Sequence, residues 1–210
     1  THTIFTKYFP RLGIKHSYFN ADDPSSIEAL IKPETKFIYL ETPTNPAIEV
    51  IDLELVGHIA KKAGLLLLVD NCFATPFLQK PIEYGADIVI HSATKYMDGQ
   101  GRVLGGVVVG RADLIREIYL YNRITGASLS AFNAWVLSKS LETLSIRMER
   151  HCENALQVAK FLEGKPGIKK VKYPFLESHP QYDIAKKQMR AGGGIVAFSL
   201  SGGLEAGAKF

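Results

Sequence analysis

The sequence has 210 residues, of which 46% are hydrophobic and 22% are charged, so it holds enough apolar material for one large domain and part of another. Its net charge of +4 is spread along the chain, and this distribution does not indicate a nucleic-acid-binding or membrane-binding surface. Cys72 and Cys152 are the only cysteines and form no CxxC pair, which excludes a cysteine metal site and a disulfide framework and favours a reducing cytoplasm.

Four short apolar runs are predicted to be strands that are buried on both faces. They are Phe37–Leu40, Leu65–Val69, Asp87–Ile90 and Gly106–Val109. None of these runs is long enough to cross a bilayer. A helix is predicted between the first two, because Asp52 can cap its start, apolar residues recur on one face from Leu53 to Ala63, and Gly64 follows its end. Strand, helix and strand form a βαβ unit, so the sequence predicts an α/β fold with a mostly parallel sheet covered by helices.

The chain becomes helical in pattern from about Ser130 to Leu162, which predicts a link to a second domain. We therefore expect a large domain over residues 1–147 and the beginning of a smaller C-terminal α+β domain over residues 148–210. Ile168–Tyr173 and Ile195–Leu200 are its candidate strands. The chain has no initiating methionine, and the helical pattern of Gly203–Phe210 stops after about two turns, so we expect a fragment of a longer protein.

Polar side chains follow the first three predicted strands, at the point where each strand ends. They lie in the segments Glu41–Pro46, Asp70–Asn71 and His91–Lys95. In open α/β sheets, ligands bind outside the carboxyl ends of the strands, so these segments are expected to meet at one pocket.

Asp70 and Lys95 are the strongest candidates for chemistry. Asp70 follows five apolar residues, where a carboxylate is costly unless a cation or several donors meet it, and a protonated ring nitrogen would do so. The alternative is that Asp70 caps the next segment or pairs with an arginine. Lys95 ends a Ser-x-Thr-Lys turn, in which a lysine amine beside hydroxyl groups suits a Schiff base near a phosphate. The alternative for Lys95 is a solvated loop.

Several other motifs indicate chemistry less strongly. Gly99-x-Gly101 with Gly105-Gly106 resembles a dinucleotide fingerprint, but the spacing of its last glycine is wrong, so nucleotide binding is not expected. His91 is expected to pack at a strand end and His58 to be solvated on a helix. Cys72 is expected to form part of a pocket wall rather than to act as a nucleophile.

Three segments together resemble the Cys/Met-metabolism family of enzymes that depend on pyridoxal 5′-phosphate (PLP). They are Glu41-Thr42-Pro43-Thr44-Asn45-Pro46, Val69-Asp70-Asn71-Cys72-Phe73-Ala74-Thr75-Pro76 and His91-Ser92-Ala93-Thr94-Lys95-Tyr96. The resemblance, which continues from Thr3 to the C-terminus, implies the fold type I of PLP-dependent transferases, an amino-acid substrate and a homotetramer built as a dimer of dimers. The cysteines have no histidine at metal-ligand spacing, so no metal is expected, and their number favours a cytoplasmic protein. It also implies that further parts of the site lie before Thr1 and beyond Phe210.

The resemblance assigns a role to each matching polar residue. Lys95 becomes the catalytic lysine that carries PLP as a Schiff base and later moves protons, and Asp70 becomes the partner of the pyridine nitrogen. Ser92 and Thr94 become phosphate ligands, and Asn45 becomes a donor near the cofactor's 3′-oxygen and the substrate carboxylate.

Within the family, the segment Asp98-Gly99-Gln100-Gly101-Arg102 most resembles O-succinylhomoserine sulfhydrylase. This implies γ-replacement on O-succinylhomoserine by a sulfur nucleophile to give homocysteine, a step of methionine biosynthesis or transsulfuration. Arg102 then contacts the succinyl carboxylate or, alternatively, braces the glycine turn. Cystathionine γ-synthase, a γ-lyase, and a non-catalytic module that keeps the fold are the other possibilities.

Overall fold

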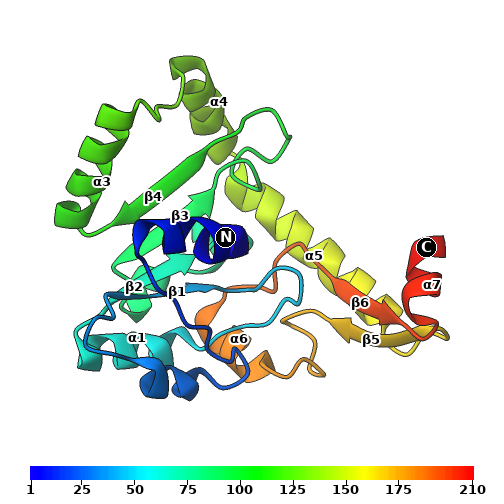
Figure 1. Ribbon diagram of the computed structural model, residues 1–210. Helices are drawn as coiled ribbons and strands as arrows, with labels where there is room; N and C mark the ends of the chain where they lie inside the picture. The colour runs from blue at the N-terminus through cyan, green and yellow to red at the C-terminus, as the bar shows by residue number, and fades with distance from the viewer.

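The computed structural model describes residues 1–210, which form a four-stranded sheet and a separate two-stranded sheet (Figure 1). In the larger sheet, β1 (Phe37–Glu41), β2 (Leu66–Asp70) and β3 (Ile88–Ser92) are parallel, and β4 (Gly106–Gly110) pairs with β3 in the antiparallel direction. The smaller sheet pairs β5 (Ile168–Lys172) with β6 (Ala197–Leu200). The predicted α/β fold with a mostly parallel sheet is confirmed.

Helix α1 (Leu53–Ala63) forms between β1 and β2 for the reasons that the sequence indicates. The Asp52 carboxylate accepts a hydrogen bond from the Leu55 N–H at 3.0 Å, and Gly64 ends the helix in the left-handed conformation with φ of 66°. The buried face of α1 packs on Ile38, Leu40 and Leu67. This packing fixes one face of the sheet and leaves the other face free for the polar residues.

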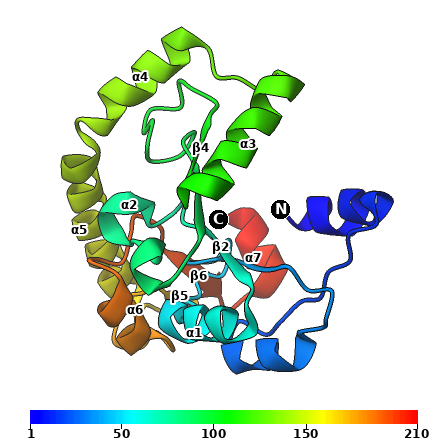
Figure 2. The ribbon, with the colours of Figure 1, turned by 90° about the vertical axis from the view of Figure 1, so that its left-hand side faces the viewer.

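The remaining helices connect and cover the strands, and Figure 2 shows α4, α5 and α6 following one another down one side of the molecule. They are η1 (Ile4–Tyr8), η2 (Phe9–Leu12), η3 (Pro24–Leu30), α2 (Thr75–Leu78), η4 (Pro81–Tyr84), α3 (Ala112–Thr125), α4 (Ala131–Leu141), α5 (Leu144–Leu162), α6 (Tyr182–Gln188) and α7 (Gly203–Lys209). Helix α5 runs without a break across the boundary predicted between residues 147 and 148, and the division into two domains stays a prediction.

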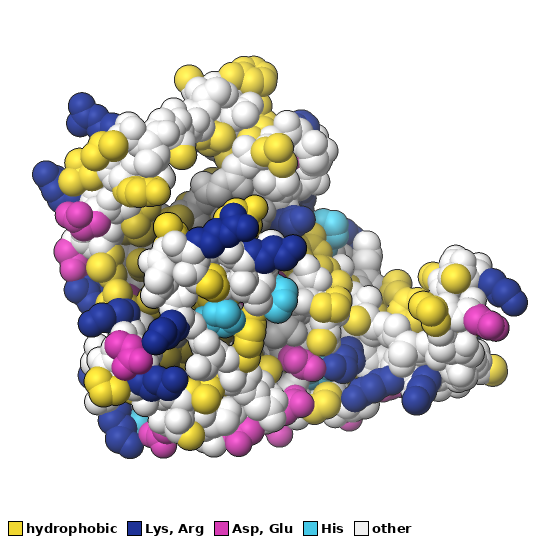
Figure 3. All heavy atoms as spheres, in the orientation of Figure 1, with side chains coloured by type: hydrophobic (Ala, Val, Ile, Leu, Met, Phe, Trp, Pro, Cys, Tyr) yellow, Lys and Arg dark blue, Asp and Glu magenta, His cyan; other side chains and the backbone are white.

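The prediction that all four strands are buried on both faces is wrong for β4. Val108 and Val109 are 37% and 43% exposed, and α3, which lies beside β4, has no buried residue. The reason is that β4 is an edge strand with a partner on one side only. Phe132 and Trp135 on α4 are exposed as well, and Figure 3 shows hydrophobic side chains at the top of the molecule, over α3 and α4.

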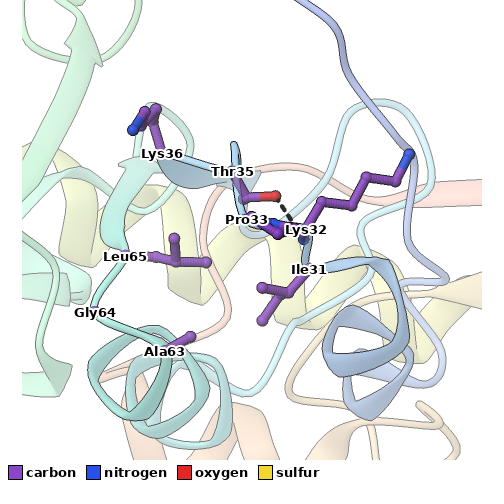
Figure 4. Close-up of a pocket in the computed structure, with 8 residues that line it drawn as sticks. All are labelled: Ile31, Lys32, Pro33, Thr35, Lys36, Ala63, Gly64 and Leu65. Carbon is purple, nitrogen blue, oxygen red and sulfur yellow. Dashed lines mark hydrogen bonds between the residues drawn. The ribbon is translucent and has the colours of Figure 1, made fainter.

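A hollow of about 520 Å³ lies at the amino ends of β1 and β2 (Figure 4). Lys36 and Leu65, which line it, directly precede these two strands. The Lys32 and Lys36 side chains lie at opposite sides of the hollow and do not converge (Figure 4). This hollow is therefore at the edge of the sheet opposite to the candidate residues. No helix in the structure combines the length and the hydrophobicity that a membrane crossing requires.

Candidate active site

The three parallel strands bring their polar carboxyl ends to one edge of the sheet. Glu41 and Asp70 are partners in the ladder of β1 and β2, and Asp70 is the partner of Ile90 on β3. Ser92 lies two residues beyond Ile90, so its side chain projects from the same face as that of Asp70. Lys95 follows in the next turn. The expected meeting of the three segments at one edge is thus present in the structure.

Asp70 accepts two hydrogen bonds that fix the plane of its carboxylate. The Cys72 N–H donates to Oδ1 at 3.1 Å, and the Tyr39 hydroxyl donates to Oδ2 at 3.2 Å. A carboxylate offers about four acceptor positions, so capacity remains for a further donor. The sequence left two other roles open for Asp70, capping of the next segment and pairing with an arginine. Asp70 forms no salt bridge with an arginine, and the bond from the Cys72 N–H is a local cap.

Lys95 lies in a helical turn that starts at the end of β3. Its N–H donates to the Ser92 carbonyl at 3.1 Å, and its carbonyl accepts the Gly99 N–H at 2.8 Å. The Lys95 side chain is exposed and forms no ion pair or hydrogen bond in the structure. Its amine is therefore available to a ligand.

The two hydroxyl groups of this turn differ in their surroundings. The Ser92 N–H donates to the Cys72 sulfur at 2.7 Å, while no bond occupies the Ser92 hydroxyl. The Thr94 hydroxyl is engaged with Gly105, to whose carbonyl it donates at 3.3 Å and from whose N–H it accepts at 3.1 Å. Ser92 is thus ready to bind an anion, whereas Thr94 would have to exchange its bond to the Gly105 carbonyl.

The loop that carries Asn45 is shaped by two threonines. The Thr42 hydroxyl accepts the Ile51 N–H at 3.0 Å, and the Thr44 hydroxyl accepts the Glu49 N–H at 3.1 Å. The Asn45 side chain is exposed and takes part in none of these bonds. Its amide is therefore free to bind a ligand.

Arg102 holds the buried Asp98 in the loop that follows Lys95. The Arg102 N–H donates to Asp98 Oδ2 at 2.7 Å, and Nε and Nη2 donate to Oδ1 at 3.2 and 3.1 Å. Burial raises the pKa of Asp98, but these bonds outweigh burial and hold the pKa below its ordinary value. Nη2 also donates to the Ser140 hydroxyl at 2.8 Å. These bonds show Arg102 bracing the glycine turn, which is one of the two roles considered for it. Substrate binding by Arg102 stays a prediction.

Arg147 on α5 is a residue of this region that the sequence analysis missed. Its Nη1 donates to the Tyr96 carbonyl at 2.7 Å, and its Nη2 donates to the Ser140 carbonyl at 3.0 Å. The guanidinium fills the space beside Gly99, where a Cβ atom would stand 2.2 Å from Nη1. Arg147 therefore ties the turn after Lys95 to helix α5, and no local motif signals this contact.

A buried amide network supports the other two segments. Gln79 Nε2 donates to the Asn71 Oδ1 at 2.8 Å and to the Thr42 carbonyl at 3.0 Å, and its Oε1 accepts from Gln188 Nε2 at 3.0 Å. Gln188 belongs to α6 and also accepts the Leu53 N–H at 3.1 Å. The network thus links the loops after β1 and β2 to the C-terminal part of the chain.

The weaker candidates lie as the sequence predicts. His91 is buried at the end of β3, and burial lowers its pKa. Burial, followed by the hydrogen bond to Asp70, raises the pKa of Cys72 to about 12, so Cys72 is a neutral thiol in the wall of the site. His58 is exposed on α1.

The groups at this edge suit a phosphorylated pyridine aldehyde such as PLP. Lys95 provides a free amine for the aldehyde, and Asp70 provides a half-buried carboxylate for a ring N–H. Ser92 provides an unused hydroxyl for the phosphate. The donor set at the site therefore fits the cofactor that the resemblance implies.

Comparison with known proteins gives a consistent result. The family model described as Cys/Met metabolism PLP-dependent enzyme matches residues 1–210. The chain is 48% identical over its whole length to an O-succinylhomoserine sulfhydrylase of Pseudomonas aeruginosa and 46% identical to an L-methionine gamma-lyase of Porphyromonas gingivalis, and it covers 52% and 53% of these proteins. The crystal structure of metB from Corynebacterium glutamicum superposes with a TM-score of 0.95 at 38% identity, over 99% of this chain and 54% of that one. The chain thus spans about half the length of the relatives it matches.

Proposed function

The chain belongs to the Cys/Met metabolism family of PLP-dependent enzymes, and we propose that the full-length protein catalyses γ-replacement on O-succinylhomoserine. The bond between Cγ and the ester oxygen breaks, succinate leaves, and a sulfur nucleophile such as sulfide forms a bond to Cγ to give homocysteine. The observation that supports this choice is the 48% identity, over the whole chain, to a protein named O-succinylhomoserine sulfhydrylase.

We propose the following roles for the residues at the carboxyl edge of the sheet. When bound, PLP accepts the electrons that are released as the bond between hydrogen and the substrate Cα breaks. Lys95 Nζ would hold the cofactor through its aldehyde group, and as a free amine the same nitrogen would take the proton from the substrate Cα. Asp70 holds the proton on the ring nitrogen, and Ser92 and Thr94 bind the phosphate. Asn45 donates to the cofactor's 3′-oxygen and the substrate carboxylate.

Arg102 is proposed to give preference for the succinyl ester. Its side chain is 45% exposed, and Nη1 takes part in none of the bonds to Asp98 and Ser140. This nitrogen could pair with the second carboxylate of a succinyl group, which an acetyl ester lacks. Arg102→Ala should then raise the KM for the succinyl ester more than for the acetyl ester, while the exposed Arg116→Ala serves as a control. Equal effects on both esters would leave Arg102 as a structural residue of the loop.

A γ-lyase is the second candidate function, because the chain is 46% identical to an L-methionine gamma-lyase. Cystathionine γ-synthase is a related alternative, in which cysteine replaces sulfide as the nucleophile. These reactions need the same lysine and carboxylate, so the site residues alone do not separate them.

The decisive experiment is to assay the full-length protein with O-succinylhomoserine, O-acetylhomoserine and methionine, each with and without sulfide. Homocysteine formed from the succinyl ester only when sulfide is present supports the proposal. Rapid release of an α-keto acid and ammonia without sulfide would identify a γ-lyase. A full-length protein that binds no PLP would indicate a non-catalytic module.

We also propose that the full-length protein is cytoplasmic and, as the family resemblance implies, a homotetramer. Light scattering coupled to size-exclusion chromatography measures the mass directly. A monomeric mass at micromolar concentration would contradict this assembly.

A further inference from the structure

Glu41 and Asp70 form a pair of neighbouring carboxyl groups at the edge of the sheet. They are ladder partners on adjacent parallel strands, and both side chains project from the face that lies opposite to α1. Adjacent strands are about 4.8 Å apart, so the two carboxyl groups share one site. Both residues are partly buried. Tyr39, two residues before Glu41 on the same face, donates its hydroxyl to Asp70 Oδ2 at 3.2 Å.

No basic side chain of the structure neutralises this pair. Neither Glu41 nor Asp70 takes part in any of the ion pairs of the chain. Two carboxylates in one half-buried site repel each other, so the second to ionise holds its proton to a higher pH. Asp70 accepts two hydrogen bonds that stabilise its anion, whereas Glu41 accepts none. Glu41 is therefore the carboxyl group of this pair that holds its proton to the higher pH.

The groups around Glu41 agree with this order. Burial and the neighbouring Asp70 raise the pKa of Glu41 to about 7, against an opposing effect of the Thr1 amino group. The other two ionisable groups that face it stay neutral at that pH. Burial and Asp70 raise the pKa of Tyr39 above its ordinary value, and burial raises that of Cys72 to about 12.

We propose that Glu41 is a positioning residue for cofactor binding. Glu41 carries a proton while Asp70 lacks a cationic partner. It releases this proton to water when the protonated ring of PLP pairs with Asp70. This inference rests on the proposed role of Asp70. Glu41 acts through Asp70 because a cation on Asp70 removes the repulsion that, together with burial, keeps Glu41 protonated. Glu41 thereby makes cofactor binding depend on pH, without itself having to touch the cofactor.

The direction of the pH dependence follows from the release of a proton. Binding lowers the pKa of Glu41, so the affinity for PLP gains a contribution that grows as the pH rises toward about 7 and levels off above it. Replacing Glu41 with glutamine, which has the same shape and no proton to lose, should remove this contribution. A purely structural role of Glu41 would instead lower the affinity equally at every pH.

The test is isothermal titration of PLP into the full-length apoenzyme at pH 7.0, in PIPES and in imidazole, whose ionisation enthalpies differ. The dependence of the measured heat on the buffer gives the number of protons released. A group with a pKa of about 7 is half protonated at this pH, so the wild type should release more protons than Glu41→Gln, up to a difference of about half a proton. Glu83→Gln on η4, where the side chain is 65% exposed, is the matched control and should behave as the wild type.

Equal proton release by the wild type and Glu41→Gln would overturn the proposal. In an Asp70→Asn background, Glu41→Gln should change the proton count less, because only burial, and no longer the Asp70 charge, then raises the pKa of Glu41. If Asp70→Asn leaves the PLP affinity unchanged, the proposed role of Asp70 fails separately from that of Glu41. Infrared difference spectra of the wild type, which need no variant, should show that a protonated carboxyl band disappears when PLP is added at pH 6.5. Persistence of that band would also contradict the proposal.

Discussion

Replacing Gln79 with leucine should destabilise the protein by about 3 kcal/mol, although leucine has a similar size. Gln79 is 1% exposed. The change leaves Asn71 Oδ1 and the Thr42 carbonyl without the donor that Gln79 Nε2 provides at 2.8 and 3.0 Å. A buried polar group that loses its partner costs about 1 to 3 kcal/mol, so two such groups cost about 3 kcal/mol even at the lower half of that range. Gln188 Nε2 adds less, because it keeps its bond to the Ile51 carbonyl at 3.0 Å.

The assay for Gln79 is urea unfolding of the full-length protein, with Gln157→Leu as the matched control. Gln157 is exposed on α5, so its replacement should change the free energy of unfolding by less than about 0.5 kcal/mol. Gln79→Leu should also weaken PLP binding, because Thr42 and Asn71 belong to the segments that carry Asn45 and Asp70. A loss of stability below about 1 kcal/mol would refute the reasoning, since it would mean that both oxygens find other donors.

Four further outcomes follow from the site. Borohydride reduction of the full-length protein should fix PLP on Lys95, and peptide mapping that finds the label on another lysine would reject this assignment. Asp70→Ala should strongly reduce turnover and change the midpoint of urea unfolding only slightly, because the ring nitrogen then loses its carboxylate partner. Near-normal turnover would exclude Asp70 as the partner of the ring nitrogen. Arg147→Met should destabilise the protein by about 2 kcal/mol by removing charged bonds to two carbonyls, whereas the exposed Arg150→Met should cost less than about 0.5 kcal/mol in the same urea experiment. Because burial raises the pKa of Cys72 to about 12, its alkylation by iodoacetamide should still accelerate between pH 9 and pH 11, and a plateau near pH 9 would show an ordinary thiol.

The parts of the fold that the sequence predicts are those set by local patterns. Helix α1 is an example, because its cap at Asp52, its apolar face and its ending at Gly64 all lie within one short segment. The burial of β4 is the opposite case. The apolar run Gly106–Val109 marks a strand correctly, but whether a strand lies inside a sheet or at its edge depends on partners elsewhere in the chain.

The candidate site divides in the same way. Asp70, Ser92 and Lys95 stand out because polar residues at the end of apolar runs are unusual, and that signal is local. Tyr39 lies inside the apolar run of β1 and carries no such signal, and Glu41 carries the signal at the end of that run but does not reveal Asp70 as its partner. Only the register between β1 and β2 brings their side chains to Asp70, and register depends on tertiary packing. The role of Glu41 at the end of β1 can therefore be inferred only when its neighbour on β2, Asp70, is known.

The glycines after Lys95 resemble a nucleotide-binding motif, but a long-range contact explains one of them. Gly99 and Gly101 resemble part of a nucleotide-binding fingerprint, yet Gly99 is needed because the Arg147 guanidinium occupies the space that a Cβ atom would fill. Its φ of 75° also suits glycine, since this is the left-handed region. The guanidinium in that space donates to the Tyr96 carbonyl, directly after Lys95. A side chain at position 99 would therefore disturb the lysine turn by displacing Arg147, so the glycine is required by the geometry of the turn rather than by a bound nucleotide.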